Sequence, residues 1–504
     1  MLTIAETRNT PARVPSPAVS SVAVAQIGAV VISGNEAVED EAYQQVVEEF
    51  FGKPLTEETL DELTDELVQV AKEAGYPHAV VSVDETAYRL GIVQVEVDEG
   101  RIDEVRIEGS DNPVAARMLG SLVGQPVSQT QLQSRLLLVS DIPGLRLRGA
   151  RLKREDGRAI LVVRLSERDP TVRLTADNYG SERYGPVRAR LSGSFAEVFN
   201  PADELSASIR TNPVDPSELL SGSLSYQTQI SDSGAVVEVA GSVGSTAPGG
   251  DVGDSDIAGE TLRASIATSI PIKRTRDLSV WLEGGADFVS IEQDAIDVML
   301  RDDTIVSLTA GIRTRFAVAG GTAGISAWVE RGLDILGATR LGDPNASRSD
   351  GDGVFTLFQA NANARLPVAK RFDLYLSASG QLADRPLLST QEMSLGGAYQ
   401  TRGYGFAEVL GDEGIVGLAE MRYRFKTGDT PLDALQIYAF ADGGYVSDID
   451  RETGEGSLFS AGSGLRGRVG PISFEIEGAL PLGGSGERDT SNDPIFNLRA
   501  GWRF

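Results

Sequence analysis

The sequence predicts a transmembrane β-barrel of about sixteen antiparallel strands that follows two small α+β domains. Three observations support this fold class. From about residue 169 to Phe504, apolar and polar residues alternate with the period of two that is typical of strands. No run of eighteen apolar residues occurs, which excludes transmembrane helices but not the short strands of a barrel. Between residues 27 and 168, the order strand, helix, helix, strand, strand occurs twice.

Composition excludes several kinds of chemistry. The 504 residues include no Cys and a single histidine, His78, which removes disulfides, thiol nucleophiles and almost all histidine-based metal or triad sites. We interpret His78 as structural or solvent-facing. The lack of Cys fits an exported bacterial protein, since unpaired thiols are a liability in an oxidising compartment. We expect no enzymatic activity, metal or cofactor.

The charge and the start of the chain add two expectations. The formal net charge of −27 argues against a nucleic-acid partner, because neutralising phosphates requires a basic protein surface. Residues 1–26 are polar and contain three prolines, which predicts a flexible lead-in. The first 21 residues show no charged segment followed by an apolar core, so no secretion signal is recognisable there.

The two α+β domains are expected at residues 27–100 and 101–168. In the first, a strand ends at Gly34, and a second helix begins after the capping residue Thr56, with apolar residues three and four apart. In the second, Ser128 and Gln131 form the capping-box pattern before a helix. Two strands close each domain.

The barrel is expected over residues 169–504. The polar face of its strands carries Arg, Gln and Asn, which a wide barrel places in a watery lumen. Most connections after even-numbered strands are short and most of the others are long, as in bacterial barrels. Strands are predicted to start near residues 171, 186, 204, 221, 235, 260, 277, 304, 322, 355, 372, 415, 434, 458, 471 and 495.

One long connection and one strand carry the candidate site. The longest irregular stretch separates the eleventh and twelfth strands and contains Arg402-Gly403-Tyr404. This tripeptide alone fits an exposed turn. In the thirteenth strand, however, the apolar set Leu435, Ile437, Ala439 and Ala441 must face lipid, which turns Phe440 and Asp442 towards the lumen. An arginine on a loop folded into the pore would pair with Asp442.

These residues resemble a known family. The two N-terminal modules resemble the polypeptide-transport-associated (POTRA) domain. With them, the run ending in Arg402-Gly403-Tyr404, the run Phe440-Ala441-Asp442-Gly443-Gly444 and the segment Gly462 to Arg466 resemble TpsB transporters of two-partner secretion, also called the haemolysin secretion/activation family. The resemblance covers about Ile27 to Phe504. The family usually has Val or Ile before the arginine, where this chain has Thr401.

The resemblance implies a function. The POTRA modules would capture an extended signal of a secreted exoprotein partner in the periplasm by adding a strand to a sheet edge, and the barrel would pass the unfolded partner through the outer membrane. The functional residues would be Arg402, Gly403 and Tyr404 in the loop and Phe440, Asp442 and Gly444 in the strand. No nucleotide-binding Gly-rich loop ends in Gly-Lys-Ser or Gly-Lys-Thr, so the energy source lies outside this chain.

The C-terminal strand also indicates that the barrel lies in the outer membrane. Leu498, Ala500, Trp502 and Phe504 alternate with polar or small residues, and the chain stops on the aromatic. This end resembles the sorting signal read by the barrel-assembly machinery, which would then be a partner during biogenesis. We therefore expect the barrel in outer-membrane lipid and the two modules in the periplasm.

Three other functions remain open. A barrel-insertion factor of the same superfamily would act on another outer-membrane protein, although such factors more often carry three or more POTRA modules. A passive porin would not need the paired modules. An outer-membrane hydrolase is disfavoured because its usual catalytic groups include histidine, and His78 lies outside the barrel.

Overall fold

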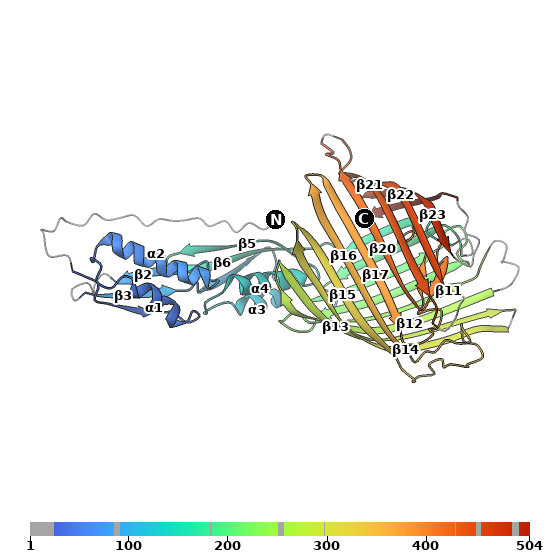
Figure 1. Cartoon of the computed structure of the whole chain (residues 1–504), viewed down its shortest axis with the longest axis horizontal. Helices are drawn as coiled ribbons and strands as arrows, with labels where there is room; N and C mark the ends of the chain where they lie inside the picture. Colours follow the sequence, from blue (N-terminus) through green and yellow to red (C-terminus); the bar gives the residue numbers. More distant parts are fainter. Residues whose placement is uncertain are drawn as a thin grey trace. The chain divides into compact units, whose positions relative to one another are not determined.

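The computed structural model describes residues 25–84, 91–181, 184–249, 257–296, 298–428, 430–449, 455–485 and 493–504. They form two compact units, divided between Arg168 and Asp169 (Figure 1). Apart from its last two residues, the expected lead-in at 1–26 lies outside the described residues. None of the described helices is both long and apolar enough to span a bilayer.

The first unit contains the same module twice. The sheet orders are β1-β3-β2 and β4-β6-β5, so each module places its last strand in the centre, parallel to the first strand and antiparallel to the other. The remaining strands are sheet edges. The first module consists of β1 (Ala29–Ser33), α1 (Asp40–Glu48), α2 (Glu57–Glu73), β2 (Val80–Asp84) and β3 (Ile92–Asp98); the second consists of β4 (Glu104–Glu108), α3 (Pro113–Gly120), α4 (Gln129–Asp141), β5 (Leu145–Glu155) and β6 (Arg158–Glu167).

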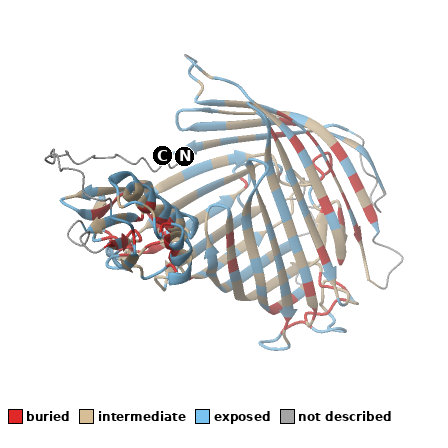
Figure 2. Cartoon of the chain, turned by 60° about the vertical axis from the view of Figure 1, so that its left-hand side comes forward, coloured by how far each residue is buried: buried red, intermediate tan, exposed pale blue. Residues whose placement is uncertain are grey.

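Capping residues define where two of these helices begin, and their apolar faces pack against the sheets. The Thr56 hydroxyl accepts a hydrogen bond from the Thr59 amide, and Ser128 and Gln131 form the predicted capping box. Each module has buried apolar residues on both its helices and its strands, and Figure 2 colours the buried residues red. His78 is partly buried, and its Cβ packs against Gly100, where a Cβ would lie only 3.2 Å away.

The second unit is a closed antiparallel barrel of sixteen strands in sequence order, which confirms the predicted fold class. Every strand pairs with its neighbours along the chain, and β24 closes the ring on β7. The strands are β7 (Thr171–Asp177), β8 (Arg188–Ala196), β9 (Asp203–Thr211), β10 (Leu219–Gln229), β11 (Val236–Thr246), β12 (Ile257–Arg274), β13 (Leu278–Ala295), β14 (Val298–Val318), β15 (Gly321–Gly332), β16 (Thr356–Ala369), β17 (Phe372–Ala383), β20 (Glu413–Arg424), β21 (Ala434–Ser447), β22 (Gly456–Val469), β23 (Ile472–Ser485) and β24 (Ile495–Arg503).

The barrel wall is uneven in height. Strand β14 begins at Val298, not near 304 as predicted, because the apolar run Val298–Leu300 continues the β13 hairpin without alternating. Strands β12 to β14 have 18 to 21 residues, whereas β7 has 7 and β24 has 9. The closing pair β24–β7 is correspondingly short and joins residues 499–503 to residues 173–177.

The two faces of the barrel follow the parity of the sequence. Large apolar side chains such as Leu191, Leu262 and Ile437 are exposed on the outside, where lipid covers them. On β21, Ala439 and Ala441 are exposed while Phe440 and Asp442 are buried. The interior therefore receives the polar set of each strand, including the charged residues of the site.

Candidate functional site

Loop 384–412 connects β17 to β20 and is folded into the barrel. It was expected to be irregular, but it contains a small ribbon formed by β18 (Met393–Leu395) and β19 (Val409–Gly411). Leu395, Tyr404 and Val409 from the loop pack with Val416, Val446 and Leu458 from the wall, and all six are buried. This apolar contact seats the loop against strands β20 to β22.

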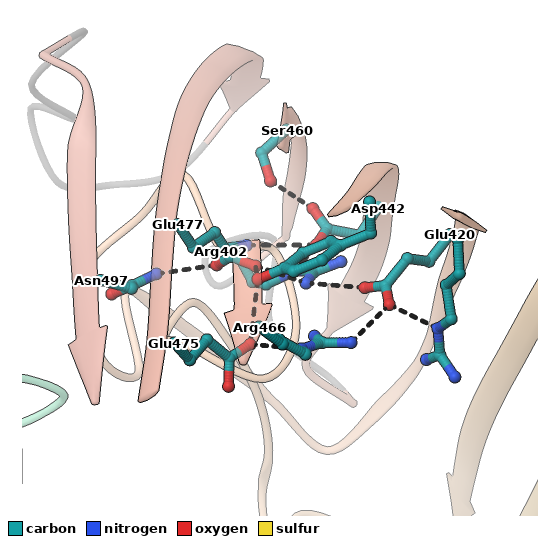
Figure 3. Close-up of polar contacts among 10 residues, drawn as sticks. Arg402, Glu420, Asp442, Ser460, Arg466, Glu475, Glu477 and Asn497 are labelled. Carbon is teal, nitrogen blue, oxygen red and sulfur yellow. Dashed lines mark hydrogen bonds and ion pairs between the residues drawn. The ribbon is translucent and has the colours of Figure 1, made fainter. Parts of the chain in front are cut away.

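Arg402 is the polar anchor of the seated loop (Figure 3). Its Nε donates to Asp442 Oδ2 at 3.0 Å, and its Nη1 donates to Glu420 Oε2 at 3.1 Å and to Glu477 Oε2 at 2.7 Å. The Arg402 side chain is only 4% exposed. The expected pair with Asp442 is therefore one contact in a set of three, which binds the loop to strands β20, β21 and β23.

The three carboxylates are themselves held by other groups. Glu420 also accepts from Arg422 and Arg466, and Asp442 accepts from the Ser460 hydroxyl. Glu477 also accepts from the Tyr438 hydroxyl and from the side-chain amide of Asn497. A fourth carboxylate, Glu475, accepts from Tyr438 and Arg466 (Figure 3). Four carboxylates thus face three guanidinium groups, so each charge is compensated by at least one opposite charge.

Phe440 supplies an apolar wall for the same arginine. The Cζ atom of Arg402 lies 3.3 Å from the centroid of the Phe440 ring, a cation–π contact. Among the described residues, Arg402 Nη2 has no hydrogen-bond partner. A Cβ on Gly462 would lie 2.6 Å from Phe440 Cζ, so this glycine leaves room for the ring. The predicted residues Arg402, Phe440 and Asp442 therefore meet in one buried cluster.

Gly403 and Tyr404 explain the rest of the loop motif. A Cβ on Gly403 would lie 2.8 Å from the backbone of Leu480 and Pro481, so no side chain fits there. The Tyr404 hydroxyl donates to the Gly483 carbonyl at 2.8 Å and accepts from the Gly483 amide at 3.2 Å. Tyr404 thus gives the loop a second contact with β23, in addition to the contact between Arg402 and Glu477.

Thr401 and Gly444 complete the seat. Thr401 has a φ of 51° and is fully buried, and its hydroxyl accepts from the Gly396 amide at 2.6 Å. The threonine therefore satisfies a buried donor that Val or Ile at this position would leave unpaired. A Cβ on Gly444 would lie 2.6 Å from Leu395 Cδ2, which shows how closely the loop ribbon approaches β21.

A second buried ion cluster was missed by the sequence reasoning. Arg348, in loop 333–355, donates to Glu392 and Asp412 of loop 384–412, with an Nη1–oxygen distance of 2.7 Å in both cases. It also contacts Asp350 at 3.2 Å and Asp448 at 3.7 Å. Arg348 therefore joins three loops. The available signal was the density of Asp and Arg in these loops, which the sequence does not distinguish from a solvated surface.

The Arg348 cluster holds more negative than positive charge. Burial raises the pKa of the Glu392 carboxyl to about 7, with Asp448 and Asp412 adding to the effect and Arg348 opposing it. Oxygens of Glu392, Asp412 and Asp448 lie within 4.8 Å of one another, a spacing that a cation could bridge. The Arg348 guanidinium already lies among them, so we treat the cluster as an ion-pair network that links the loops.

The predicted C-terminal residues lie at the closing pair. The Phe504 amide donates to the Val172 carbonyl at 3.0 Å, so the last residue is bonded to the first strand of the barrel. The rings of Trp502 and Phe504 stack with their centroids 6.1 Å apart. Both side chains are exposed, at 46% and 68%.

Known proteins share this combination of modules and barrel. A family model described as haemolysin secretion/activation protein ShlB/FhaC/HecB matches residues 157–467, and a ShlB-type POTRA domain model matches residues 25–100. The chain belongs to the haemolysin secretion/activation family. It is thus an outer-membrane transporter of the two-partner secretion type, with its POTRA modules in the periplasm.

Curated relatives and solved structures agree with the family. Outer membrane transporter CdiB of Escherichia coli is 22% identical over 483 residues, covering 90% of this chain and 79% of the relative. Heme/hemopexin transporter protein HuxB of Haemophilus influenzae is 22% identical over 474 residues, covering 89% and 82%. The solved structure of CdiB from Escherichia coli aligns with a TM-score of 0.80 at 20% identity, covering 95% of this chain and 90% of that one. CdiB from Acinetobacter baumannii aligns with a TM-score of 0.69 at 15% identity, covering 96% and 91%. These structures share the fold.

Proposed function

We propose that this transporter exports one partner polypeptide in unfolded form through the barrel, and that loop 384–412 must leave its seat for the polypeptide to pass. The observation that carries the proposal is the buried contact of Arg402 with Asp442, Glu420 and Glu477 on the inner wall. A loop whose polar anchor consists of charge-assisted hydrogen bonds can move when water or a passing chain replaces them.

The POTRA modules provide the capture step. Their sheets leave the strands β1, β2, β4 and β5 paired on one side only. An extended segment of the partner can add to such an edge through main-chain hydrogen bonds, with side chains alternating between the two faces. The partner class is therefore a secreted exoprotein with an extended signal segment in the periplasm.

The C-terminal residues serve assembly, not transport. Trp502 and Phe504 present exposed aromatic rings at the end of the closing strand. We assign them to recognition by the barrel-assembly machinery, which makes that machinery a partner during biogenesis.

A deletion of the gene tests the proposal against insertion of other barrels. The secreted and outer-membrane proteomes of the source bacterium would be compared with and without the gene. Export predicts the loss of one large protein from the medium with an unchanged set of outer-membrane barrels. Depletion of several barrels, with the secreted set intact, would instead make the chain an insertion factor.

A further inference from the structure

The two POTRA modules carry opposite charge. Residues 27–100 contain 3 Lys and Arg against 18 Asp and Glu, while residues 101–168 contain 12 Lys and Arg against 8 Asp and Glu. The chain as a whole has a negative net charge, but its second POTRA module has a positive one. Its cations are concentrated on β5, whose sequence is LRLRGARLKRE.

Four of the five β5 cations lie on one face of the sheet, and Arg154, which is opposite Ala159, lies on the other. Arg146 is opposite Ser166 and Arg151 is opposite Val162 on β6, and residues opposite each other in antiparallel strands share a face. The bulge between Leu147 and Gly149 keeps Arg148 on this side, where its Nε donates to Ser166 Oγ at 2.7 Å. We call Arg146, Arg148 and Arg151 the basic stripe.

The basic stripe is not neutralised within the protein. In the part of the chain that the structure describes, none of its three arginines forms an ion pair, and Arg151 Nε is buried without a hydrogen-bond partner. Other cations of the module behave differently. Arg106, Arg158 and Arg164 pair with Glu104 or Glu108, and Lys153 pairs with Glu155. The stripe therefore presents uncompensated positive charge on an edge strand.

The module fold does not require such a stripe. The equivalent edge strand of the first module, β2, reads VVSVD and contains no cation. The two modules also differ in their distance from the barrel along the chain. Strand β6 ends at Glu167 and the first barrel strand begins at Thr171, so the tether spans at most about 14 Å. Since Arg146 is opposite Ser166, the stripe begins at the tethered end of the sheet.

We infer that the basic stripe of the second POTRA module binds the anionic phospholipid headgroups of the membrane leaflet that surrounds the periplasmic end of the barrel. Clustered Arg and Lys beside a membrane-spanning segment bind anionic headgroups in this way. The phosphate group also matches the forked donors of arginine. Binding would hold this face of the module at the membrane surface.

The full chain in nanodiscs tests this inference. Because the chain contains no Cys, Ser166→Cys introduces a unique attachment point for a fluorophore on the face of the stripe. Brominated lipids would quench the fluorophore more in discs that contain phosphatidylglycerol than in discs of phosphatidylcholine alone. The difference should disappear near 1 M salt, where the Debye length is about 3 Å. A label at Thr130→Cys, on helix α4, reports on another surface of the module and should not show it.

Two matched double variants distinguish a specific effect of the basic stripe from a general effect of lost positive charge. The double variant R146Q/R148Q should weaken the apparent affinity for phosphatidylglycerol roughly thirtyfold, whereas R117Q/R135Q removes the same charge from helices α3 and α4 and should retain the affinity. Both variants should keep a heat-modifiable barrel. Equal quenching in the two kinds of disc, or equal losses in the two variants, would overturn the inference. A response to polyglutamate in place of lipid, lost in R146Q/R148Q, would also overturn it and assign the stripe to acidic polypeptides.

Discussion

The guanidinium carbon of Arg402 lies 3.3 Å from the centroid of the Phe440 ring while its Nε donates to Asp442, two residues further along the same strand. One side chain of β21 thus provides the surface and the other the charge. Neither contact alone fixes a flexible arginine, but together they leave one orientation in which Nη1 reaches Glu420 and Glu477. The motifs of the loop and the strand are therefore two halves of one binding site.

We expect Arg402→Ala and Asp442→Ala each to impair secretion of the partner while the barrel stays folded. Arg402→Ala should be more severe, because it removes a contact from three buried carboxylates and, among the described residues, leaves Asp442 and Glu477 without a cation, and breaking a buried pair commonly costs about 3–5 kcal/mol. The double variant should be little worse than Arg402→Ala alone, since both changes remove the same interaction. Secretion assays with heat-modifiability as the folding control measure this. Simple addition of the two losses would argue against a shared site.

Gly403→Ala should unseat the loop without changing any charge. The new methyl group would lie 2.8 Å from the Leu480–Pro481 backbone, which cannot withdraw without disturbing β23. The matched control is Gly405→Ala, where the nearest atom is the flexible Glu408 Oε2 at 3.1 Å and the position is exposed. Protease accessibility of loop 384–412 in intact cells should increase for the first variant only. Similar accessibility in both variants would contradict the tight seat.

The Arg348 cluster predicts a pH dependence with a definite sign. The pKa of Glu392 is about 7 in the folded protein and 4.5 ordinarily, so the folded state holds the proton more tightly. Its contribution to stability is full below about pH 4.5 and is lost as the pH rises through 7. At pH 8, Glu392→Gln should stabilise the protein relative to the wild type, by at most about 3 kcal/mol, whereas at pH 5 the two should be similar. Thermal unfolding at both pH values measures the difference, and an unchanged difference would refute the assignment.

Two changes at the C-terminus separate assembly from closure of the ring. Deleting Phe504 removes both the aromatic ring and the amide that bonds Val172, while Phe504→Ala removes only the ring. If the ring is the insertion signal, both variants should show less heat-modifiable barrel in the outer membrane. Wild-type amounts in both would contradict an assembly role, and a loss confined to the deletion would assign the effect to the hydrogen bond.

Local patterns predicted much of this molecule. The period of two gave the strands and also the inward orientation of Asp442, because parity depends only on neighbouring residues. The capping signals at Thr56 and Ser128 are equally local. Glu420 and Glu477 were not predicted as partners of Arg402, since they lie on β20 and β23 and meet it only after four strands have paired in register. The Arg348 cluster requires three loops to converge, and no short-range pattern encodes that.

The barrel closes through one short strand pair, β24–β7. Eighteen residue pairs join β13 to β14, but only five join β24 to β7, so the ring has far less hydrogen bonding to resist widening there. The closing strand β24 is also linked to the loop through a shared carboxylate. Glu477 accepts from Arg402 on one oxygen and from Asn497, on the closing strand β24, on the other. If loop 384–412 leaves its seat as proposed, Glu477 loses the Arg402 cation while its other oxygen still accepts from Asn497, so the moving loop and the closing strand share one carboxylate.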